Sequence, residues 1–196
     1  QNGQFHTIKA DYCFNNIPAY FMAGIENNFS ETYQAGLNSI KRGHLFKIAY
    51  QMKERFWEKE GIYGGISYTA DPIAQVWYPS HDIHANKGIL LGAYTWDPKA
   101  SAAFEAMTPS ERLVAGAKSG EKIHPGYSKY IENGISIPWA RMNHQMGCGM
   151  RMGKEDFDKY YHVLQKPEGR HFMIGDQISH HSGWQEGALA SSEQAL

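Results

Sequence analysis

Alternation of apolar and polar residues predicts the strands of this chain. The alternation is already present at residues 4–14, so the chain begins inside a predicted strand, and we expect a fragment or a processed subunit. Asp-Pro and His-Asp turns separate the central strands, and residues 44–95 are therefore expected to form an antiparallel meander. The further segments of strand composition are 44–52, 64–70, 74–80, 88–96, 134–141 and 170–175.

Apolar residues at helical spacing predict the helices. Ser30 can cap one of them, and the sequence Thr108-Pro109-Ser110-Glu111 opens another with a cap, a first-turn proline and an acid. The helical segments are 17–25, 31–41, two within 97–118 that are expected to cover the sheet, and a last one that begins at Ser182 or Gly183. A block of strands, a block of helices, and a returning strand and helix predict an α+β fold.

Composition and charge narrow the classes of partner. Nineteen basic and twenty acidic residues give a formal charge of -1, and no basic run is long enough to suggest nucleic acid or an anionic membrane as a partner. No apolar stretch reaches the roughly 18 residues of a membrane span. Cys13 and Cys148 stand far apart, so we expect free, buried thiols rather than a disulfide framework.

Lys47 is the first candidate for chemistry. It interrupts the apolar run of the strand at 44–52, where burying an ammonium costs several kcal/mol unless a partner compensates. A lysine held there would suit a catalytic site. The alternative is a lysine whose stem packs on the sheet while its ammonium reaches water.

The segment that ends the chain is the second candidate. A short strand runs into Gly175-Asp176, a polar loop and the small residues that open the last helix, which is a natural place for a polar or anionic ligand. Gly183 lets a ligand approach the backbone, and Trp184 offers a flat ring. The alternative is an ordinary strand-loop-helix turn in which Asp176 is a local cap.

Histidines and aromatic residues give weaker signals. His81-Asp82-Ile83-His84 could supply metal ligands, and His180 and His181 form a second pair, but neither matches a known metal-binding frame, and surface loops are the simpler interpretation. Aromatic residues in strands pack in cores more often than they form substrate cages. Those that punctuate the strands are Trp57, Trp77, Tyr78, Tyr94, Trp96, Trp139 and Trp184.

Three stretches carry a resemblance to a known family. FWEKEGIYGG, WYPSHDIHANKGILLGAY and GRHFMIGDQISHHSGWQEGA together resemble the L-amino-acid oxidase and monoamine oxidase flavoproteins, and the similarity runs from Ala10 to the end of the chain in the family's order. The resemblance implies FAD as the cofactor. It also implies that residues 1–43 end an FAD-binding domain and lead to a substrate-binding domain at 44–136. Residues 137–196 would then return to complete a Rossmann-like FAD-binding domain.

The resemblance also implies roles for single residues. Lys47, ten residues before Trp57, would be the catalytic lysine that holds a water against flavin N5. Tyr94 would bind a substrate carboxylate, Gly183 would offer its carbonyl to the substrate amine, and Trp184 would form a wall of the substrate site. The residues implied in cofactor binding are Trp139, Gly175, Asp176, Trp184 and Gln185.

The chain departs from the family pattern at two places, of which the first would form part of the pocket wall for the substrate side chain. After Trp139 the chain reads ARMNHQMGCGMRM instead of a Tyr-Ala-x-Gly stretch, and Asp176 stands where the family usually has a glutamate. The chain contains no GxGxxG motif, so the dinucleotide fingerprint and the family's carboxylate-binding arginine would belong to an N-terminal portion present as a separate chain.

The activity implied is the oxidation of an L-amino acid. Hydride passes from the amine carbon to flavin N5, the imine hydrolyses to a 2-oxo acid and ammonia, and dioxygen becomes hydrogen peroxide. The alternatives are a primary-amine or polyamine oxidase, an amino-acid monooxygenase, or a non-catalytic subunit or fragment. We expect the assembled enzyme to be a homo-oligomer, with a secreted or periplasmic location favoured over the cytoplasm.

Overall fold

The computed structural model describes residue 3 and residues 5–196, and the chain divides into two compact units. The first unit contains the chain up to Arg42 together with Gly149–Leu196, and the second contains Gly43–Cys148. Each unit has its own group of buried apolar residues and is described by itself.

The described strands of the second unit form an antiparallel sheet in the order β4-β5-β6-β3-β7, which confirms the antiparallel expectation. β4, β5 and β6 follow one another as in a meander, whereas β3 lies between β6 and β7. The expected meander over the whole of 44–95 is therefore wrong. The elements are β3 Phe46–Met52, α3 Phe56–Lys59, β4 Ile66–Tyr68, β5 Gln75–Trp77, β6 Gly88–Thr95, α4 Pro98–Ala106, α5 Pro109–Gly120, η1 Tyr127–Tyr130, β7 Ile131–Pro138 and η2 Trp139–Arg141.

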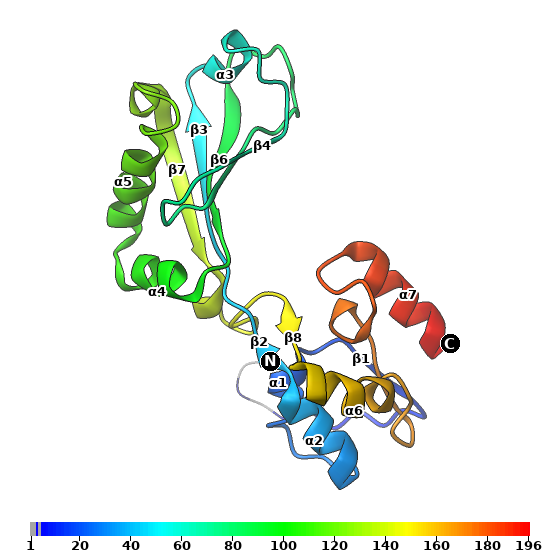
Figure 1. The fold of residues 1–196 in the computed structure, drawn as a ribbon. Helices are drawn as coiled ribbons and strands as arrows, with labels where there is room; N and C mark the ends of the chain where they lie inside the picture. Colours follow the sequence, from blue (N-terminus) through cyan, green and yellow to red (C-terminus); the bar gives the residue numbers. More distant parts are fainter. Residues whose placement is uncertain (1–2, 4) are drawn as a thin grey trace. The chain divides into compact units, whose positions relative to one another are not determined.

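The helices α4 and α5 cover one face of this sheet, as expected (Figure 1). Phe46 stacks on Phe104 of α4 with ring centroids 4.3 Å apart, and the Tyr50 hydroxyl donates to the Leu113 carbonyl of α5 at 2.6 Å. A methyl group added to Gly116 would lie 2.6 Å from Ile48, so α5 can come this close only with a glycine there. The opposite face of the sheet, called here the open face, carries the intervening residues of β3.

Local capping explains where these helices begin. The Asp97 carboxylate accepts the Ala100 N–H at 2.7 Å, and Pro98 occupies the first turn of α4. Thr108 and Glu111 form a reciprocal capping box at the start of α5, in which each side chain accepts the other residue's N–H. The predicted helix starts are confirmed.

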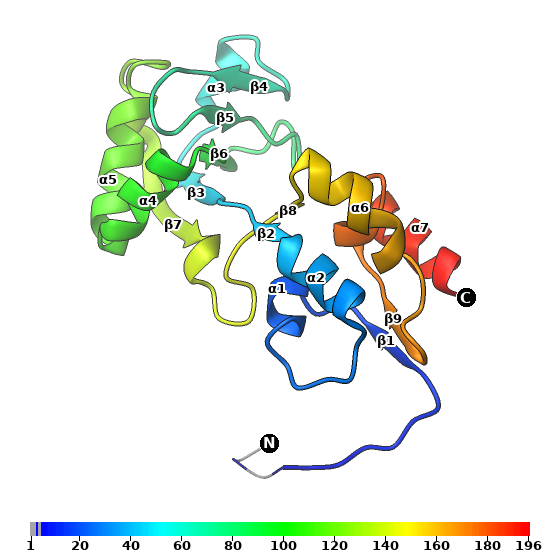
Figure 2. The ribbon, with the colours of Figure 1, turned by 60° about the horizontal axis from the view of Figure 1, so that its bottom comes forward.

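The first unit is built from helices around short strands (Figure 2). β1 pairs in parallel with β9, and β2 pairs antiparallel with β8. The elements are β1 Cys13–Asn15, α1 Ala19–Met22, α2 Glu31–Ser39, β2 Lys41–Arg42, β8 Met150–Arg151, α6 Lys154–Leu164, β9 His171–Met173, η3 Asp176–Ile178 and α7 Gln185–Ala195. The Ser30 hydroxyl accepts the Tyr33 N–H at 3.3 Å, which confirms the predicted cap of α2.

Several expectations for the first unit are wrong. The predicted strand at 4–14 is reduced to β1, with residue 4 outside the described residues, and Phe5 and Ile8 are almost fully exposed. Alternation alone did not create a strand here because no neighbour pairs with residues 5–12. Cys13 and Cys148 are free but exposed rather than buried. None of the helices in the described part is long and apolar enough to cross a membrane.

Candidate functional site

Lys47 lies on the open face of the sheet, not among the buried residues of β3. Strand alternation turns Phe46, Ile48, Tyr50 and Met52 inward and leaves Lys47 half-buried on the other side. The expectation that Lys47 interrupts the buried face is therefore wrong. Its position matches the alternative in which the stem packs on the sheet and the ammonium stays near the surface.

Lys47 and Tyr94 form a cross-strand pair. They oppose each other in the register of β3 and β6, and Lys47 Nζ lies 4.4 Å from the centroid of the Tyr94 ring. At this distance the ammonium is attracted to the negative face of the ring. Burial raises the pKa of the Tyr94 phenol, so its hydroxyl keeps a proton and can donate a hydrogen bond to a carboxylate.

Two tryptophans flank Tyr94. The rings of Trp77 and Trp96 meet the Tyr94 ring edge-on, with centroid distances of 5.5 and 5.1 Å. The sequence did not distinguish these tryptophans from core aromatics such as Trp57, which is fully buried. Alternation along β6 was the signal that could have found one of them, because Tyr94 and Trp96 are two residues apart.

Trp139 lies where β7 ends. Its backbone N–H donates to the carbonyl of Leu45 at 3.1 Å. Leu45 directly precedes β3 and stands two residues before Lys47 in the sequence. The indole Nε1 is buried and finds no hydrogen-bond partner among the described residues. A buried indole N–H normally has a partner, so this donor could hold an acceptor of a bound group.

In the first unit, Gly175 and Asp176 form a tight turn after β9. Gly175 has φ +110°, and a Cβ at this position would collide with Asn16 Oδ1. Its N–H donates to Ser191 Oγ at 2.7 Å. Asp176 Oδ2 accepts the Gly183 N–H at 2.7 Å, so the carboxylate closes the loop that precedes α7. This contact is the local cap considered from the sequence, and it leaves the other carboxylate oxygen for a ligand.

The start of α7 presents an open backbone. Trp184 is the N-cap residue, its side chain caps nothing, and it is 71% exposed. Gly183 has φ +87°, and a Cβ there would meet nothing within 4 Å. The first N–H groups of a helix lack partners inside the helix, so Gln185 begins a site where a polar edge or an anion is favoured.

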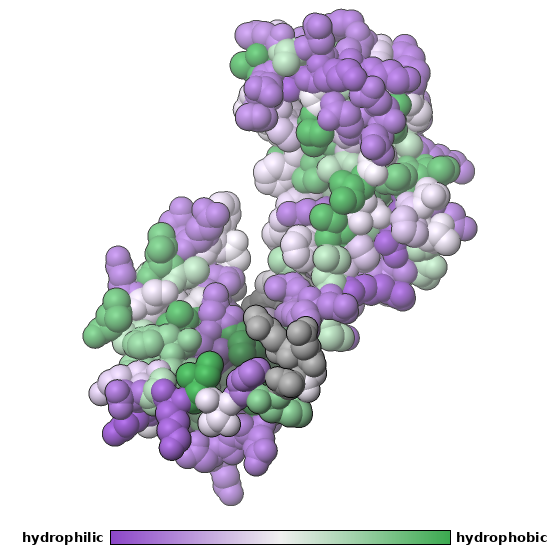
Figure 3. Space-filling view, turned by 180° about the vertical axis from the view of Figure 1, so that it is seen from behind, coloured by the Kyte–Doolittle hydropathy of each residue, from purple (hydrophilic) through white to green (hydrophobic). Residues whose placement is uncertain are grey.

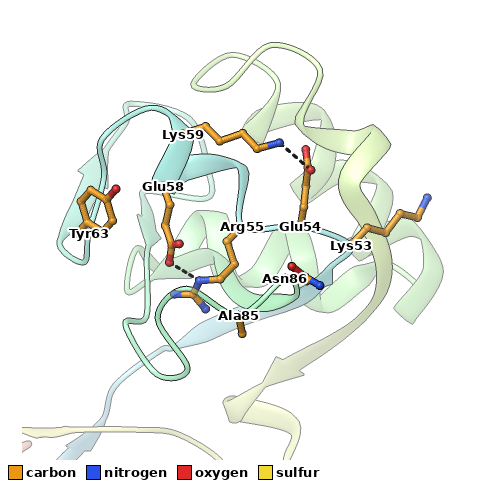
Figure 4. Close-up of a pocket in the computed structure, with 8 residues that line it drawn as sticks. All are labelled: Lys53, Glu54, Arg55, Glu58, Lys59, Tyr63, Ala85 and Asn86. Atoms are coloured by element: carbon orange, nitrogen blue, oxygen red, sulfur yellow. Dashed lines mark hydrogen bonds and ion pairs between the residues drawn. The ribbon is translucent and has the colours of Figure 1, made fainter.

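Two surface pockets lie elsewhere in the second unit. One of about 610 Å³ is lined by Lys53, Glu54, Arg55, Glu58, Lys59, Tyr63, Ala85 and Asn86 (Figure 4). Its charges pair with one another: Arg55 is bonded to Glu58, and Lys59 lies 2.8 Å from Glu54. The other, of about 520 Å³, is lined by Gln51, His81, Asp82, Ala85, Lys87, Gly88, Ile89 and Glu132. Neither contains a residue to which the resemblance implies a role, although the second includes His81 and Asp82.

The histidines show no metal centre in the described part of the chain. His81 and Asp82 are paired at 3.4 Å, with side chains 90% and 72% exposed. A different histidine is buried: His124 lies between the Glu60 carboxylate at 2.8 Å and the Tyr78 hydroxyl at 2.6 Å. The sequence did not single out His124.

The comparisons with known proteins identify the family. The model described as flavin containing amine oxidoreductase matches residues 3–195, so this chain belongs to that family. FAD is the cofactor that this membership indicates. The mixed α and β elements and the antiparallel sheet agree with the expected fold class.

Similar proteins include oxidases with different substrates. An L-amino-acid oxidase of Siganus canaliculatus is 30% identical over 173 residues, which are 87% of this chain and 33% of the relative. The flavin-dependent L-tryptophan oxidase RebO of Lentzea aerocolonigenes is 25% identical, over 97% of this chain and 42% of the relative. A solved structure of putrescine oxidase with putrescine bound is similar in fold, with a TM-score of 0.82 at 15% identity over 94% of this chain and 41% of that one. This chain thus spans less than half of each.

Proposed function

We propose that this chain is part of an FAD-dependent oxidase that converts an L-amino acid to a 2-oxo acid, ammonia and hydrogen peroxide. The observation that carries the proposal is the Lys47–Tyr94 pair on the open face, which combines an ammonium with a protonated phenol. Both groups attract a carboxylate, and a carboxylate distinguishes an amino acid from a simple amine. Membership of the amine oxidoreductase family supplies the reaction class.

In this proposal the residues of the second unit act on the substrate. Tyr94 donates its phenol hydrogen to the substrate carboxylate, and Lys47 holds a water that moves a proton at the reacting amine. Of the first unit, Gly183 offers its carbonyl to the amine and Trp184, whose ring is exposed, forms a wall for the substrate. Dioxygen is the second substrate.

Two of the proposed cofactor contacts come from groups that lack hydrogen-bond partners in the described part of the chain. In the second unit, the unpaired Trp139 indole N–H fits an acceptor of a flavin ring. In the first unit, the open backbone at Gln185 fits a polar edge, while Gly175 and Asp176 fit the ribityl or phosphate region. Asp176 is shorter than the glutamate usual in the family and already binds Gly183, so it would contact the cofactor with one oxygen. The flavin, when bound, accepts a hydride from the amine carbon and passes two electrons to dioxygen.

We also propose that the rest of the FAD site lies outside these 196 residues. The relatives are more than twice as long as the part that this chain matches. The expected segments 1–43 and 137–196, which include the first unit, would complete a Rossmann-like domain together with an N-terminal portion on a separate chain. The assembled enzyme would be a homo-oligomer that is secreted or periplasmic.

The second candidate function is a primary-amine or polyamine oxidase, favoured by the likeness of the fold to putrescine oxidase. The test uses the assembled flavoprotein and measures peroxide and carbonyl products from L-amino acids and from the corresponding decarboxylated amines. We expect turnover of amino acids with the 2-oxo acid as product. Turnover of the amines alone would reject the proposal in favour of this candidate, and an amide product would indicate a monooxygenase.

A further inference from the structure

The edge-on arrangement of Trp77, Tyr94 and Trp96 creates an aromatic wall on the open face. Trp77 is held in place because its indole N–H donates to Gln75 Oε1 at 2.7 Å, and Tyr94 is held by Lys47 over its ring. Trp96, which follows β6 directly, is 52% exposed, far more than a core tryptophan such as Trp57. A large ring left this exposed beside a candidate site has surface available for a ligand.

The surroundings of this wall are mostly apolar, with Gln51, Gln75 and Asn133 as the polar residues at paired positions. Lys47 is the charged residue among the strand positions of the open face that are paired in the described sheet. The apolar and aromatic side chains at these positions are Ala49, Ile66, Tyr68, Trp77, Ile89, Leu91, Tyr94, Ile135 and Ile137. Ile89 and Ile135 are 44% and 60% exposed, and Figure 3 shows apolar residues breaking the hydrophilic surface. A substrate side chain that lies on this face leaves water and contacts apolar side chains instead.

We propose, on the basis of the function proposed above, that Trp77 and Trp96 select an L-amino acid with an aromatic side chain. The carboxylate binds at the Tyr94 hydroxyl, and the aromatic side chain packs against the two tryptophan rings. Offset or edge-to-face packing with such rings stabilises an aromatic group beyond the effect of its buried area. An aliphatic side chain gains only the area term, and an alanine side chain reaches neither ring.

A cationic side chain is disfavoured at the same place. An ammonium could bind an aromatic cage, but the Tyr94 ring is already covered by Lys47 at 4.4 Å, and a second cation would be repelled. No carboxylate occupies the paired positions of β3, β5 and β6 to compensate for that repulsion within the described sheet. Lysine, arginine and diamines are therefore poor substrates.

The experiment compares kcat/KM for L-tryptophan, L-phenylalanine, L-alanine and L-lysine in the assembled holoenzyme. We expect the aromatic amino acids to be preferred over L-alanine and L-lysine by at least about tenfold, the effect of one good aromatic contact. Trp96→Ala and Trp77→Ala should each reduce kcat/KM for L-tryptophan about tenfold and leave that for L-alanine within about threefold. Trp96→Phe should restore most of the loss.

Ile89→Ala is the matched control. It removes an exposed apolar side chain from the same face of β6, about 16 Å from Tyr94, and should leave the ratio of L-tryptophan to L-alanine unchanged. A second measurement does not need turnover: calorimetric binding of indole-3-propionate, an aromatic carboxylate without an amine, should be tight relative to propionate and weakened about tenfold in Trp96→Ala.

The outcomes separate this inference from the proposed function. Preference for L-alanine or L-lysine, or an unchanged substrate ratio in both tryptophan variants, would overturn the aromatic assignment while the oxidase proposal stands. Turnover of 2-phenylethylamine but of no amino acid would reject the amino-acid function. The same tryptophan variants would then test the aromatic wall with two amines, by comparing kcat/KM for 2-phenylethylamine and for ethylamine. Loss of the preference for 2-phenylethylamine in these variants would support the wall, and an unchanged preference would overturn it.

Discussion

The two units hold their candidate residues in different ways. In the second unit, Lys47 and Tyr94 lie on adjacent strands, and their contact is set by the register of β3 and β6 over a buried core. In the first unit, Asp176, Gly183 and Trp184 lie in a loop that one carboxylate contact closes. Loops open more readily than core strands, so the second unit is the more preorganised half. The Lys47–Tyr94 pair is therefore expected to keep its geometry more strictly than the loop residues do.

The largest expected effect is on the free energy of unfolding, and it distinguishes a buried tryptophan from an exposed one. Trp57→Ala removes a fully buried ring that contacts Phe56 and lies under Arg55, and it should lower the free energy of unfolding by about 3–5 kcal/mol. Trp184→Ala removes an exposed ring and should change it by less than about 0.5 kcal/mol. Denaturant unfolding of the assembled protein measures both. Equal losses of unfolding free energy in the two variants would contradict the distinction between the buried Trp57 and the exposed Trp184.

A smaller effect is expected from the site lysine. Lys47→Met keeps the apolar stem on the sheet but removes the ammonium, and it should slow turnover or flavin reoxidation at least tenfold, about 1.4 kcal/mol of barrier. Stopped-flow spectroscopy of the two half-reactions measures it. Lys87→Met, which removes a surface partner of Glu132, is the control and should not change either rate. Unchanged rates in Lys47→Met would defeat the assignment.

The loop of the first unit should respond more weakly. Asp176→Ala leaves the Gly183 N–H without its acceptor and should cost about 1 kcal/mol of loop stability. Hydrogen exchange at the Gly183 amide should accelerate about fivefold, and FAD affinity should fall by a similar factor. Asp176→Asn retains an acceptor oxygen and should behave nearly as the parent. Unaltered exchange in Asp176→Ala would show that the loop is held by other contacts.

The smallest effect is a dependence on pH that belongs to the first unit. Burial lowers the pKa of His171, against an opposing influence of Glu168, and its ring packs on Phe29 with centroids 4.6 Å apart. The unfolded chain therefore binds a proton more readily than the folded one near the ordinary value of 6.5. Stability should be retained above this pH and should fall as the pH drops below it. Thermal unfolding at pH 8 and pH 5 tests this, and His171→Gln should flatten the difference.

Local signals predicted the elements better than their pairing. The capping sequence from Thr108 and the cap at Ser30 gave helix starts that the structure confirms, because these contacts involve residues three apart. The position of β3 between β6 and β7 depends on pairs such as Met52 with Gly88 and Phe46 with Pro138, which are far apart in the sequence, and alternation contains no information about it. α6, which packs on α2, was not predicted although Phe157, Tyr161 and Leu164 have helical spacing.

The candidate site shows the same limit. Resemblance to the family picked out Lys47 and Tyr94, and the structure brings these two together, but the face on which Lys47 lies was expected wrongly. The choice between two faces of a strand depends on which face the helices cover, and that is decided by packing such as Phe46 on Phe104. The tryptophans beside Tyr94 became distinguishable from core tryptophans only once that face was known.

The second unit begins and ends at neighbouring points. The Cys148 N–H donates to the Gly43 carbonyl at 3.1 Å, and Phe46 at the start of β3 pairs with Pro138 at the end of β7. A segment with adjacent ends is an insertion that can be removed or exchanged without stretching the host chain. Residues 43–148 could therefore be exchanged for another lobe at the same two points, and the exchange would replace Lys47 and Trp139 together with the whole sheet.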